Sequence, residues 1–508
     1  MPSYLQIENI SKSYGPKVLF EHIGFNINEG DKIALIAPNG TGKTSLLRIL
    51  AGKDSSDSGG KILFLRDIRI AFLEQEYEYD PESTVWDQIM RDSEQWTKNL
   101  DPEHLAEYEQ RVRRLLTSFG MSEYDRKMKV LSGGEIKRAA IIVMLASEAD
   151  FFVMDEPTNH LDIDAIAWLE DFLSEYFGTV IVVSHDRHFL NDVCTHIVDI
   201  DYTKIKMYVG NYEFWYESSQ MMQRLIKQQN KKVEDKIAEL KTFIARFSAN
   251  KSKSKQATSR RKLLDNLTVE ELPASSRRYP FIGFDMDREL GKEVLQVSGI
   301  SKTVDGVKLL NNVSFTLGRT DKVAFIGESE QAITMLFKIL MEEETPDEGT
   351  FKWGVSTSTS YFPVDNSAYF NDNDDSILDW IRQYSTADET ETFLRGFLGR
   401  MLFSGDDIYK PVKVLSGGEK VRCMFARMML FHSNVLLLDR PTNHLDLESI
   451  TAVNNGLVNF KGVVILSSHD HEILETVANR IIEITPDGCI DRQGTYEEYL
   501  AWKKENGK

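Results

Sequence analysis

The sequence of 508 residues predicts an α/β fold made of two similar domains in tandem, joined by a basic α-helical hairpin. Three observations support this prediction. Uniformly apolar runs alternate with helical runs, which is typical of a parallel sheet covered on both faces. Three short motifs occur twice at one constant separation, and a basic stretch lies between the two copies.

The first copy alternates between predicted strands and helices. The predicted strands are residues 4–10, 31–36, 68–74, 151–154 and 179–183. Residues 82–118 are polar and mostly helical, and a further helix runs from Leu131 to about Ala146. The second copy repeats this order, with buried strands predicted at residues 435–438 and 463–466.

The three repeated motifs share an offset of 284 residues, as between Leu131 and Leu415. They are Leu-Ser-Gly-Gly-Glu at 131–135 and 415–419, Asp-X-Pro-Thr-Asn-His-Leu-Asp at 155–162 and 439–446, and Ser-His-Asp at 184–186 and 468–470. One offset for three motifs indicates duplication rather than chance. We therefore predict domains at residues 1–217 and 281–508, with a linker at 218–280.

The composition fits an ordinary globular protein, with 42% hydrophobic and 27% charged residues. No apolar run approaches the roughly 18 residues that cross a bilayer, and residues 1–6 lack the regions of a signal peptide. Three scattered cysteines, Cys194, Cys423 and Cys489, match no metal spacing and no disulfide framework, which favours a cytoplasmic location. The net charge of −19 argues against nucleic-acid binding over the whole surface, but it leaves room for a local basic element.

A phosphate-binding loop is predicted at residues 37–44, Ala-Pro-Asn-Gly-Thr-Gly-Lys-Thr. It follows an apolar run and opens a helical run, the context in which backbone N–H groups surround a phosphate. Lys43 would reach the β- and γ-phosphates, and Thr44 would hold Mg²⁺. Ala37 stands where the pattern has its first glycine. The alternative is a glycine-rich turn before an ordinary helix, which the position of Lys43-Thr44 after a strand disfavours.

The linker differs in charge from the rest of the chain. Residues 222–280 contain fifteen basic and six acidic side chains, a net charge of +9. We predict a long helix, a polar basic tip at 248–256 and a returning helix to about Leu267. Two interpretations stay open: a solvated spacer, or a probe that contacts a phosphate backbone.

Together these motifs resemble ATP-binding cassette proteins. The tandem cassettes and the basic linker resemble the ABC-F family of translation and ribosome-protection factors. The resemblance implies two cassettes that close head to tail around ATP and Mg²⁺ in a monomeric cytoplasmic protein. It also implies that the linker contacts the rRNA and tRNA of the ribosome. The residues expected to do so are Asn250, Lys251, Lys253, Lys255, Arg260 and Arg261.

In this family each ATP lies between the loop of one cassette and the signature motif of the other. For site one, the resemblance implies adenine stacking on Tyr14, metal contacts from Gln75 and Asp155, water activation by Glu156 and a γ-phosphate contact from His185. The remaining ATP-binding residues are Asn39, Gly40, Gly42, Lys43, Thr44 and Ser45 of the loop and Ser416, Gly417, Gly418 and Glu419 of the signature. Every part needed for phosphoryl transfer is present.

Site two has lost most of these parts. In the second loop, residues 327–334, Ile333 replaces the lysine, while Glu330 and Ala332 replace glycines. Val364 stands at the glutamine position and Arg440 at the catalytic glutamate. We predict that this site binds no ATP, that Glu330 and Arg440 form an ion pair, and that the second cassette serves as a lid for site one. Neutral decay or deliberate alteration stays open as an alternative.

The leading functional prediction is a slow ATPase that hydrolyses ATP at one site, binds the ribosome and acts on translation through its linker. A non-hydrolysing, ATP-dependent binding module or regulatory protein is the alternative. The ATPase subunit of a transporter is a third possibility, but it gives the basic linker no role.

Overall fold

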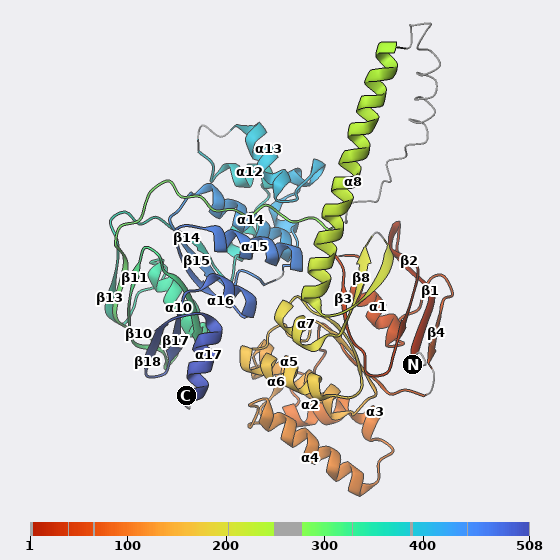
Figure 1. Cartoon of the computed structure of the whole chain (residues 1–508). Coiled ribbons are helices and arrows are strands. Elements are labelled where there is room, and N and C mark those ends of the chain that lie inside the picture. Colours follow the sequence, from red (N-terminus) through yellow and green to blue (C-terminus); the bar gives the residue numbers. More distant parts are fainter. Residues whose placement is uncertain are drawn as a thin grey trace. The chain divides into compact units, whose positions relative to one another are not determined.

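The computed structural model describes residues 4–38, 40–64, 67–201, 203–247, 277–327, 329–386, 390–443 and 445–506. The chain divides into two compact units (Figure 1). The first consists of residues 1–161, 168–184 and 189–277, and the second of residues 162–167, 185–188 and 278–508. Among the described residues, no helix combines the length and the apolar character needed to span a membrane.

The large sheet of the first cassette has the strand order β5-β6-β7-β3-β8-β9. Its strands are β3 (Lys32–Ile36), β5 (Ile70–Leu73), β6 (Phe151–Asp155), β7 (Thr179–Val183), β8 (His196–Asp201) and β9 (Lys204–Val209). The first five in this order are parallel, and β9 pairs antiparallel with β8. Strands β3, β6 and β7 are buried along their whole length, as expected for a sheet covered on both faces.

The first cassette also has a small antiparallel sheet of three strands, which shares a hydrophobic core with the large sheet. It consists of β1 (Leu5–Tyr14), β2 (Lys17–Ile27) and β4 (Lys61–Phe64), in the order β2-β1-β4. Leu5 and Phe20 of this sheet share one buried cluster with Leu47 and Ile181. The predicted strand at residues 4–10 is confirmed as β1, which pairs antiparallel with both of its neighbours. The alternating burial along β2 is the signal for an antiparallel strand with one solvated face.

The helices of the first cassette agree with the sequence. They are α1 (Lys43–Leu50), α2 (Val85–Asp92), α3 (Glu94–Thr97), α4 (Pro102–Ser118), α5 (Gly133–Ala146), α6 (Ile163–Glu175) and α7 (Arg187–Val193). The helical character predicted for residues 82–118 and the end of α5 at Ala146 are both confirmed. Ser132 and Glu135 form a reciprocal capping box, so the signature motif itself starts α5.

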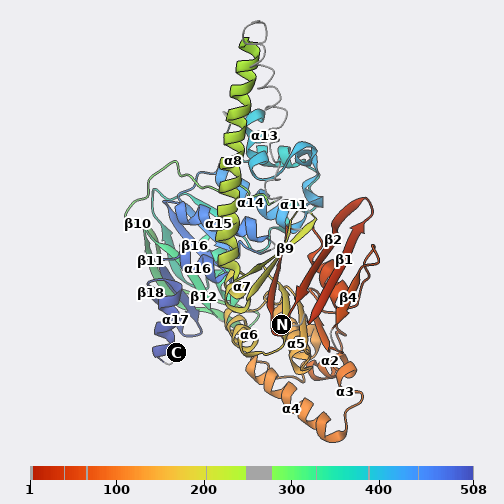
Figure 2. The ribbon, with the colours of Figure 1, turned by 45° about the vertical axis from the view of Figure 1, so that its right-hand side comes forward.

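The linker begins with one long helix, α8 (Tyr212–Phe247), of 36 residues. Figures 1 and 2 show that α8 extends away from the sheet of the first cassette. It confirms the predicted first linker helix, and it starts before residue 217, where the boundary was predicted. The predicted tip and the returning helix lie outside the described residues.

The second cassette repeats the same architecture. Its large sheet has the order β14-β15-β16-β12-β17-β18 and its small sheet β11-β10-β13. The strands are β10 (Glu293–Val304), β11 (Val307–Gly318), β12 (Lys322–Gly327), β13 (Glu348–Trp353), β14 (Thr359–Phe362), β15 (Val435–Asp439), β16 (Val463–Ser467), β17 (Arg480–Thr485) and β18 (Gly488–Gln493). The helices are α10 (Glu330–Leu340), α11 (Ser367–Phe370), α12 (Ile377–Arg382), α13 (Glu391–Arg400), α14 (Gly417–Leu430), α15 (Leu447–Asn459), α16 (His471–Val477) and α17 (Tyr496–Glu505). The matching sheet orders agree with the duplication read from the motifs.

Candidate nucleotide site

The sheet order of the first cassette brings four predicted site segments to one edge. The phosphate loop follows β3, Asp155 ends β6, His185 follows β7, and Gln75 follows β5. Because these strands are parallel neighbours, their carboxyl ends meet at the same side of the sheet. Gln75 is exposed and His185 is half-buried.

The first loop has the backbone of a phosphate-binding turn. Gly40 and Gly42 have φ angles of +73° and +98°, which L side chains rarely adopt. A Cβ on Gly42 would also lie 3.0 Å from the Leu19 side chain. Lys43 opens α1, and its Nζ donates to the carbonyl of Ala37 at 2.8 Å. Asn39 lies outside the described residues.

Asp155 suits the coordination shell of a divalent cation. Its side chain is buried, and its carboxylate hydrogen-bonds the Thr44 hydroxyl. Within the described part of the chain, Oδ2 of Asp155 is buried and has no hydrogen-bond partner. Burial is the main cause that raises the pKa of this carboxyl above its usual range. A buried, unsatisfied carboxylate oxygen beside a hydroxyl fits Mg²⁺, which prefers oxygen ligands.

Glu156 has a left-handed backbone, with φ at +48°. Its N–H donates to the carbonyl of Val183 at 2.8 Å, so the neighbouring strand β7 holds this conformation. Non-glycine residues in this region are uncommon and gather at functional sites. With this conformation the chain enters a turn directly after β6.

Tyr14, at the end of β1, presents an aromatic ring of which 59% is exposed. The preceding residues are held by two aspartates. Asp57 accepts hydrogen bonds from the Ser13 N–H at 2.7 Å and from its hydroxyl at 2.8 Å, and Asp54 pairs with Lys12 at 2.9 Å. These contacts hold the chain directly before Tyr14, and the exposed ring is open to stacking by a planar ligand.

The second loop differs from the first in secondary structure. Helix α10 begins at Glu330, the position that aligns with Gly40, whereas α1 begins at Lys43. The Ser329 hydroxyl caps α10 by accepting a hydrogen bond from the Ala332 N–H at 3.2 Å. Ile333, at the lysine position, is 6% exposed and packs in the core. The N–H groups that form a turn in the first cassette belong to a helical turn here.

A network of side chains fills the corresponding edge of the second sheet. Arg440 pairs with the Glu330 carboxylate, whose other oxygen lies 2.7 Å from His469 Nε2. Asp439 accepts hydrogen bonds from Thr334 at 2.7 Å and from Ser467 at 2.8 Å, one on each oxygen. The predicted Glu330–Arg440 ion pair is confirmed. Unlike Asp155, Asp439 has both carboxylate oxygens satisfied by the protein.

Comparison with known proteins also shows two copies of one domain in this chain. A family profile described as ABC transporter matches residues 20–159 and 310–443, and a second profile with that description matches residues 198–283. ABC transporter F family member 2 of Arabidopsis thaliana is 30% identical and aligns with 98% of this chain and 79% of its own length. This chain belongs to the ABC-F family.

Two further relatives of this ABC-F protein are bacterial. The uncharacterized ABC transporter ATP-binding protein YkpA of Bacillus subtilis is 48% identical over 98% of this chain and 97% of its own length. The energy-dependent translational throttle protein EttA of Mycobacterium tuberculosis is 29% identical over 94% of this chain and 90% of its own. A crystal structure of archaeal ribosome recycling factor aABCE1 with stalk protein aP1 matches with a TM-score of 0.65 at 18% identity, covering 97% of this chain and 92% of that one, which shows a shared fold.

The signature motifs of this ABC-F protein are intact in both cassettes. Ser416 caps α14 as Ser132 caps α5, and each serine hydroxyl contacts the carboxylate of the glutamate three residues later. Glu419 thus caps its own helix, and its role in ATP binding stays a prediction. Gly417 and Gly418 form the first turn of α14.

Sequence reasoning missed Lys137, a buried lysine on α5. Its Nζ lies 3.4 Å from the carbonyl oxygens of Glu74 and Gln75 and 3.5 Å from that of Asp155. A charged residue one turn before Ile141, on the buried face of an apolar helix, was the signal that could have revealed it.

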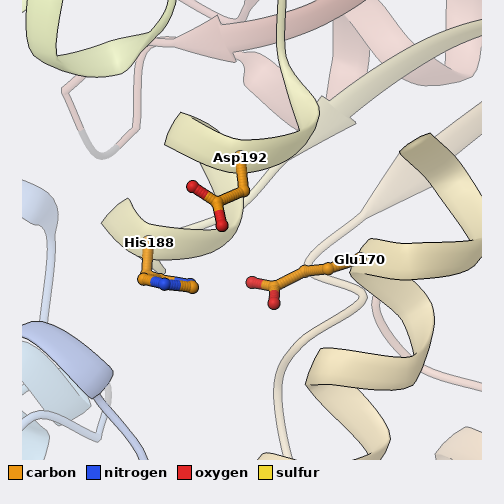
Figure 3. Close-up of side chains that lie close together, drawn as sticks. All are labelled: Glu170, His188 and Asp192. Carbon is orange, nitrogen blue, oxygen red and sulfur yellow. The ribbon is translucent and has the colours of Figure 1, made fainter. Parts of the chain in front are cut away.

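A separate cluster of a histidine and two carboxylates lies on helices α6 and α7. Figure 3 shows Glu170, on α6, and His188 and Asp192, on α7, with their side chains directed toward one another. Their possible ligand atoms lie within 4.8 Å of one another. Carboxylates and imidazole bind divalent cations, but exposed acidic groups commonly gather without one, and we assign no ion to this cluster.

The two described ends of the linker meet at Asp199, on β8. Trp215 of α8 donates from Nε1 to Asp199 at 3.2 Å, and Arg277 pairs with the same carboxylate at 2.7 Å. The Arg277 guanidinium also lies 4.8 Å from the centre of the Trp215 ring. The candidate RNA-contacting residues, Asn250, Lys251, Lys253, Lys255, Arg260 and Arg261, lie outside the described residues.

Proposed function

We propose that this ABC-F protein is a slow ATPase with one competent site, which uses the loop of the first cassette. The contrast between the two aspartates that end β6 and β15 carries the proposal. Asp155 has a buried oxygen left for a metal shell, whereas both oxygens of Asp439 are used internally. The remodelled second loop, with Ile333 in the core, supports the same conclusion.

In this proposal the residues of site one divide the work. Lys43 and the N–H groups from Gly40 to Ser45 bind the β- and γ-phosphates. Thr44, Gln75 and Asp155 hold Mg²⁺, which supplies charge stabilisation to the phosphates when bound. Glu156 orients and polarises the attacking water, and His185 contacts the γ-phosphate. Tyr14 stacks on adenine.

The second cassette contributes its signature to this site in the ATP-bound form of the monomer. Ser416 offers a hydroxyl, and Gly417 and Gly418 offer N–H groups that a backbone without Cβ atoms can bring close to phosphate. The N-terminus of α14 carries the positive end of the helix dipole, which would favour an anion in that form. The second cassette is thus a lid, and ATP binding is a switch between open and closed forms.

We further propose that the switch acts on the ribosome through the linker, which places the protein in the cytoplasm. The relative named a translational throttle supports this assignment. So does the charge of the linker, +9 in a chain of −19, because one-signed basic segments bind phosphate backbones. Lys251, Lys253 and Lys255 are the residues expected to contact rRNA or tRNA.

The ATPase half of the proposal is tested by steady-state phosphate release. Lys43→Ala and Glu156→Gln should each lower the rate at least about 100-fold, because both act on the transferred group. The matched control is Thr334→Ala in the second cassette, which should leave the rate within twofold. Equal rates for wild type and Glu156→Gln would show instead a binding module that does not hydrolyse ATP.

The ribosome half is tested by co-sedimentation of Glu156→Gln protein with ribosomes. ATP should increase the bound fraction, and replacing Lys251, Lys253 and Lys255 with glutamate should abolish it. Replacing three lysines on the described part of α8, Lys231, Lys232 and Lys236, controls for a change in overall charge. Binding that survives the first triple variant contradicts the role of the linker tip.

A further inference from the structure

Lys137 is 5% exposed, and its hydrogen-bond acceptors within the described residues are three carbonyl oxygens at 3.4–3.5 Å, with no carboxylate among them. Burying an ammonium group is costly, and here burial lowers the pKa of Lys137 to about 8. A methionine or valine would fill the same space on an apolar helix without that cost. Because packing alone does not explain a lysine at this position, we looked for a functional role in its contacts.

The three carbonyls belong to two strand ends. Glu74 and Gln75 directly follow β5, and Asp155 is the last residue of β6. Gln75 directly follows Glu74 in the first segment, and Glu156 directly follows Asp155 in the second. One ammonium group thus links the segment that carries the candidate metal-sensing glutamine to the segment that carries the candidate catalytic glutamate.

The second cassette provides an internal comparison. Val421, buried in α14, occupies the position that corresponds to Lys137 by the 284-residue offset of the signatures. At the same offset Arg440 replaces Glu156, and Val364 replaces Gln75 nearby. The lysine is thus absent from the cassette in which both side chains that it would position are also absent.

Another buried lysine behaves differently. Lys32, at the start of β3, donates to the carbonyls of Tyr176 at 2.5 Å and Gly178 at 2.8 Å. The second cassette keeps its counterpart, Lys322, which donates to Leu457 at 2.9 Å and Val458 at 2.8 Å. This contact lies at the opposite end of the sheet from the site, and its presence in both cassettes indicates a structural role. The loss of a buried lysine from the second cassette is therefore specific to the site edge.

We propose that Lys137 is a positioning residue for ATP hydrolysis, which ties the end of β5 to the end of β6 and so sets the distance between Gln75 and Glu156. This inference rests on the proposed function, since it concerns the same site. It predicts an effect on turnover rather than on ATP affinity, because the carbonyls that Lys137 contacts belong to the segments that carry Gln75 and Glu156.

The test compares Lys137→Met with Lys32→Met in the full-length protein. Each substitution removes one buried ammonium from carbonyl acceptors, so both should lower the melting temperature. Lys137→Met should also lower kcat about 10- to 100-fold while the ATP dissociation constant stays within twofold, because small misplacements of catalytic groups are costly. Lys32→Met should leave kcat within twofold. Lys137→Gln, which keeps N–H donors without the charge, should recover part of the rate even where Lys137→Met folds poorly.

Two results would overturn the inference. One is a kcat for Lys137→Met equal to that of wild type. The other is an equal loss of kcat in Lys32→Met, which would mean that destabilisation explains the effect. Glu156→Gln is assayed alongside: a wild-type rate no higher than this variant overturns the proposed function and the inference together. A wild-type rate well above Glu156→Gln with an unimpaired Lys137→Met overturns the inference alone.

Discussion

In the second cassette, Nε2 of His469 lies 2.7 Å from Oε1 of Glu330, and Arg440 pairs with the same carboxylate. The corresponding residues of the first cassette are His185, Gly40 and Glu156. The second cassette thus surrounds an internal carboxylate with the histidine and with an arginine in place of the glutamate. We interpret this carboxylate as a permanent substitute for a bound phosphate.

Arg440→Glu should destabilise the second cassette. The substitution places a third carboxylate beside Glu330 and Asp439, whose Oδ1 lies 3.6 Å from Arg440 Nε. Because Glu330 is about half exposed, we expect the free energy of unfolding to fall by about 2 kcal/mol, less than for a buried pair. This corresponds to a melting temperature lower by roughly 4–8 °C. Arg395→Glu, which breaks an exposed pair with Glu391, is the control and should change it little. An unchanged melting temperature for Arg440→Glu removes support for the internal carboxylate.

Ile333→Lys should not restore ATP binding to the second cassette. The side chain at this position lies in the core with Leu336 and Phe337, so a lysine would bury an ammonium group at a cost of about 3 kcal/mol. The measurement is nucleotide binding in a Lys43→Ala background, where the first loop is disabled. ATP binding gained by this single substitution would contradict the helical structure of the second loop.

The two signature serines should differ in importance. If the second cassette completes the first site, Ser416→Arg should lower ATPase activity at least about 100-fold by placing a bulky side chain against the γ-phosphate. Ser132→Arg, at the same capping position in the first cassette, should leave activity within about threefold. Phosphate release by both variants decides the matter. Greater loss for Ser132→Arg would assign the ATP to the other pairing of loop and signature.

Asp199→Asn should destabilise the base of the linker. The change breaks the ion pair between the buried Arg277 and Asp199, and breaking a buried ion pair typically costs about 3–5 kcal/mol. Glu82→Gln is the control, since Glu82 also pairs with two cations, Lys127 and Lys129, but at the surface. Thermal unfolding should show a clear shift for Asp199→Asn alone. Equal shifts for the two variants would mean that burial adds nothing to the Asp199 contacts.

Much of the architecture could be predicted from local patterns. Strands such as β7 are continuous apolar runs, and α5 starts with its own capping box, so both were located within a residue or two. The ion pair between Glu330 and Arg440 was also predictable, because opposite charges replaced two residues that meet at one ligand. Motifs with fixed spacing gave the candidate residues of site one, whose roles stay predictions.

Other features depend on tertiary packing. The three-stranded antiparallel sheets were missed because β1 pairs with β4, a strand distant in sequence, and no local pattern predicts that pairing. Nothing in the local sequence distinguishes Lys137 from a surface lysine, because its burial depends on contacts between α5 and the ends of β5 and β6. The early start of α10 was hidden too, since a serine cap and an acidic first turn can replace a glycine loop without changing the length of the chain.

Counting the bound nucleotides decides whether the protein has one competent site, formed by the loop of the first cassette. Equilibrium dialysis of Glu156→Gln protein with saturating ATP and Mg²⁺ measures the number bound per chain. We expect one ATP per chain, which Lys43→Ala abolishes and Thr334→Ala leaves in place. Two ATP per chain, or one that survives Lys43→Ala, would contradict it.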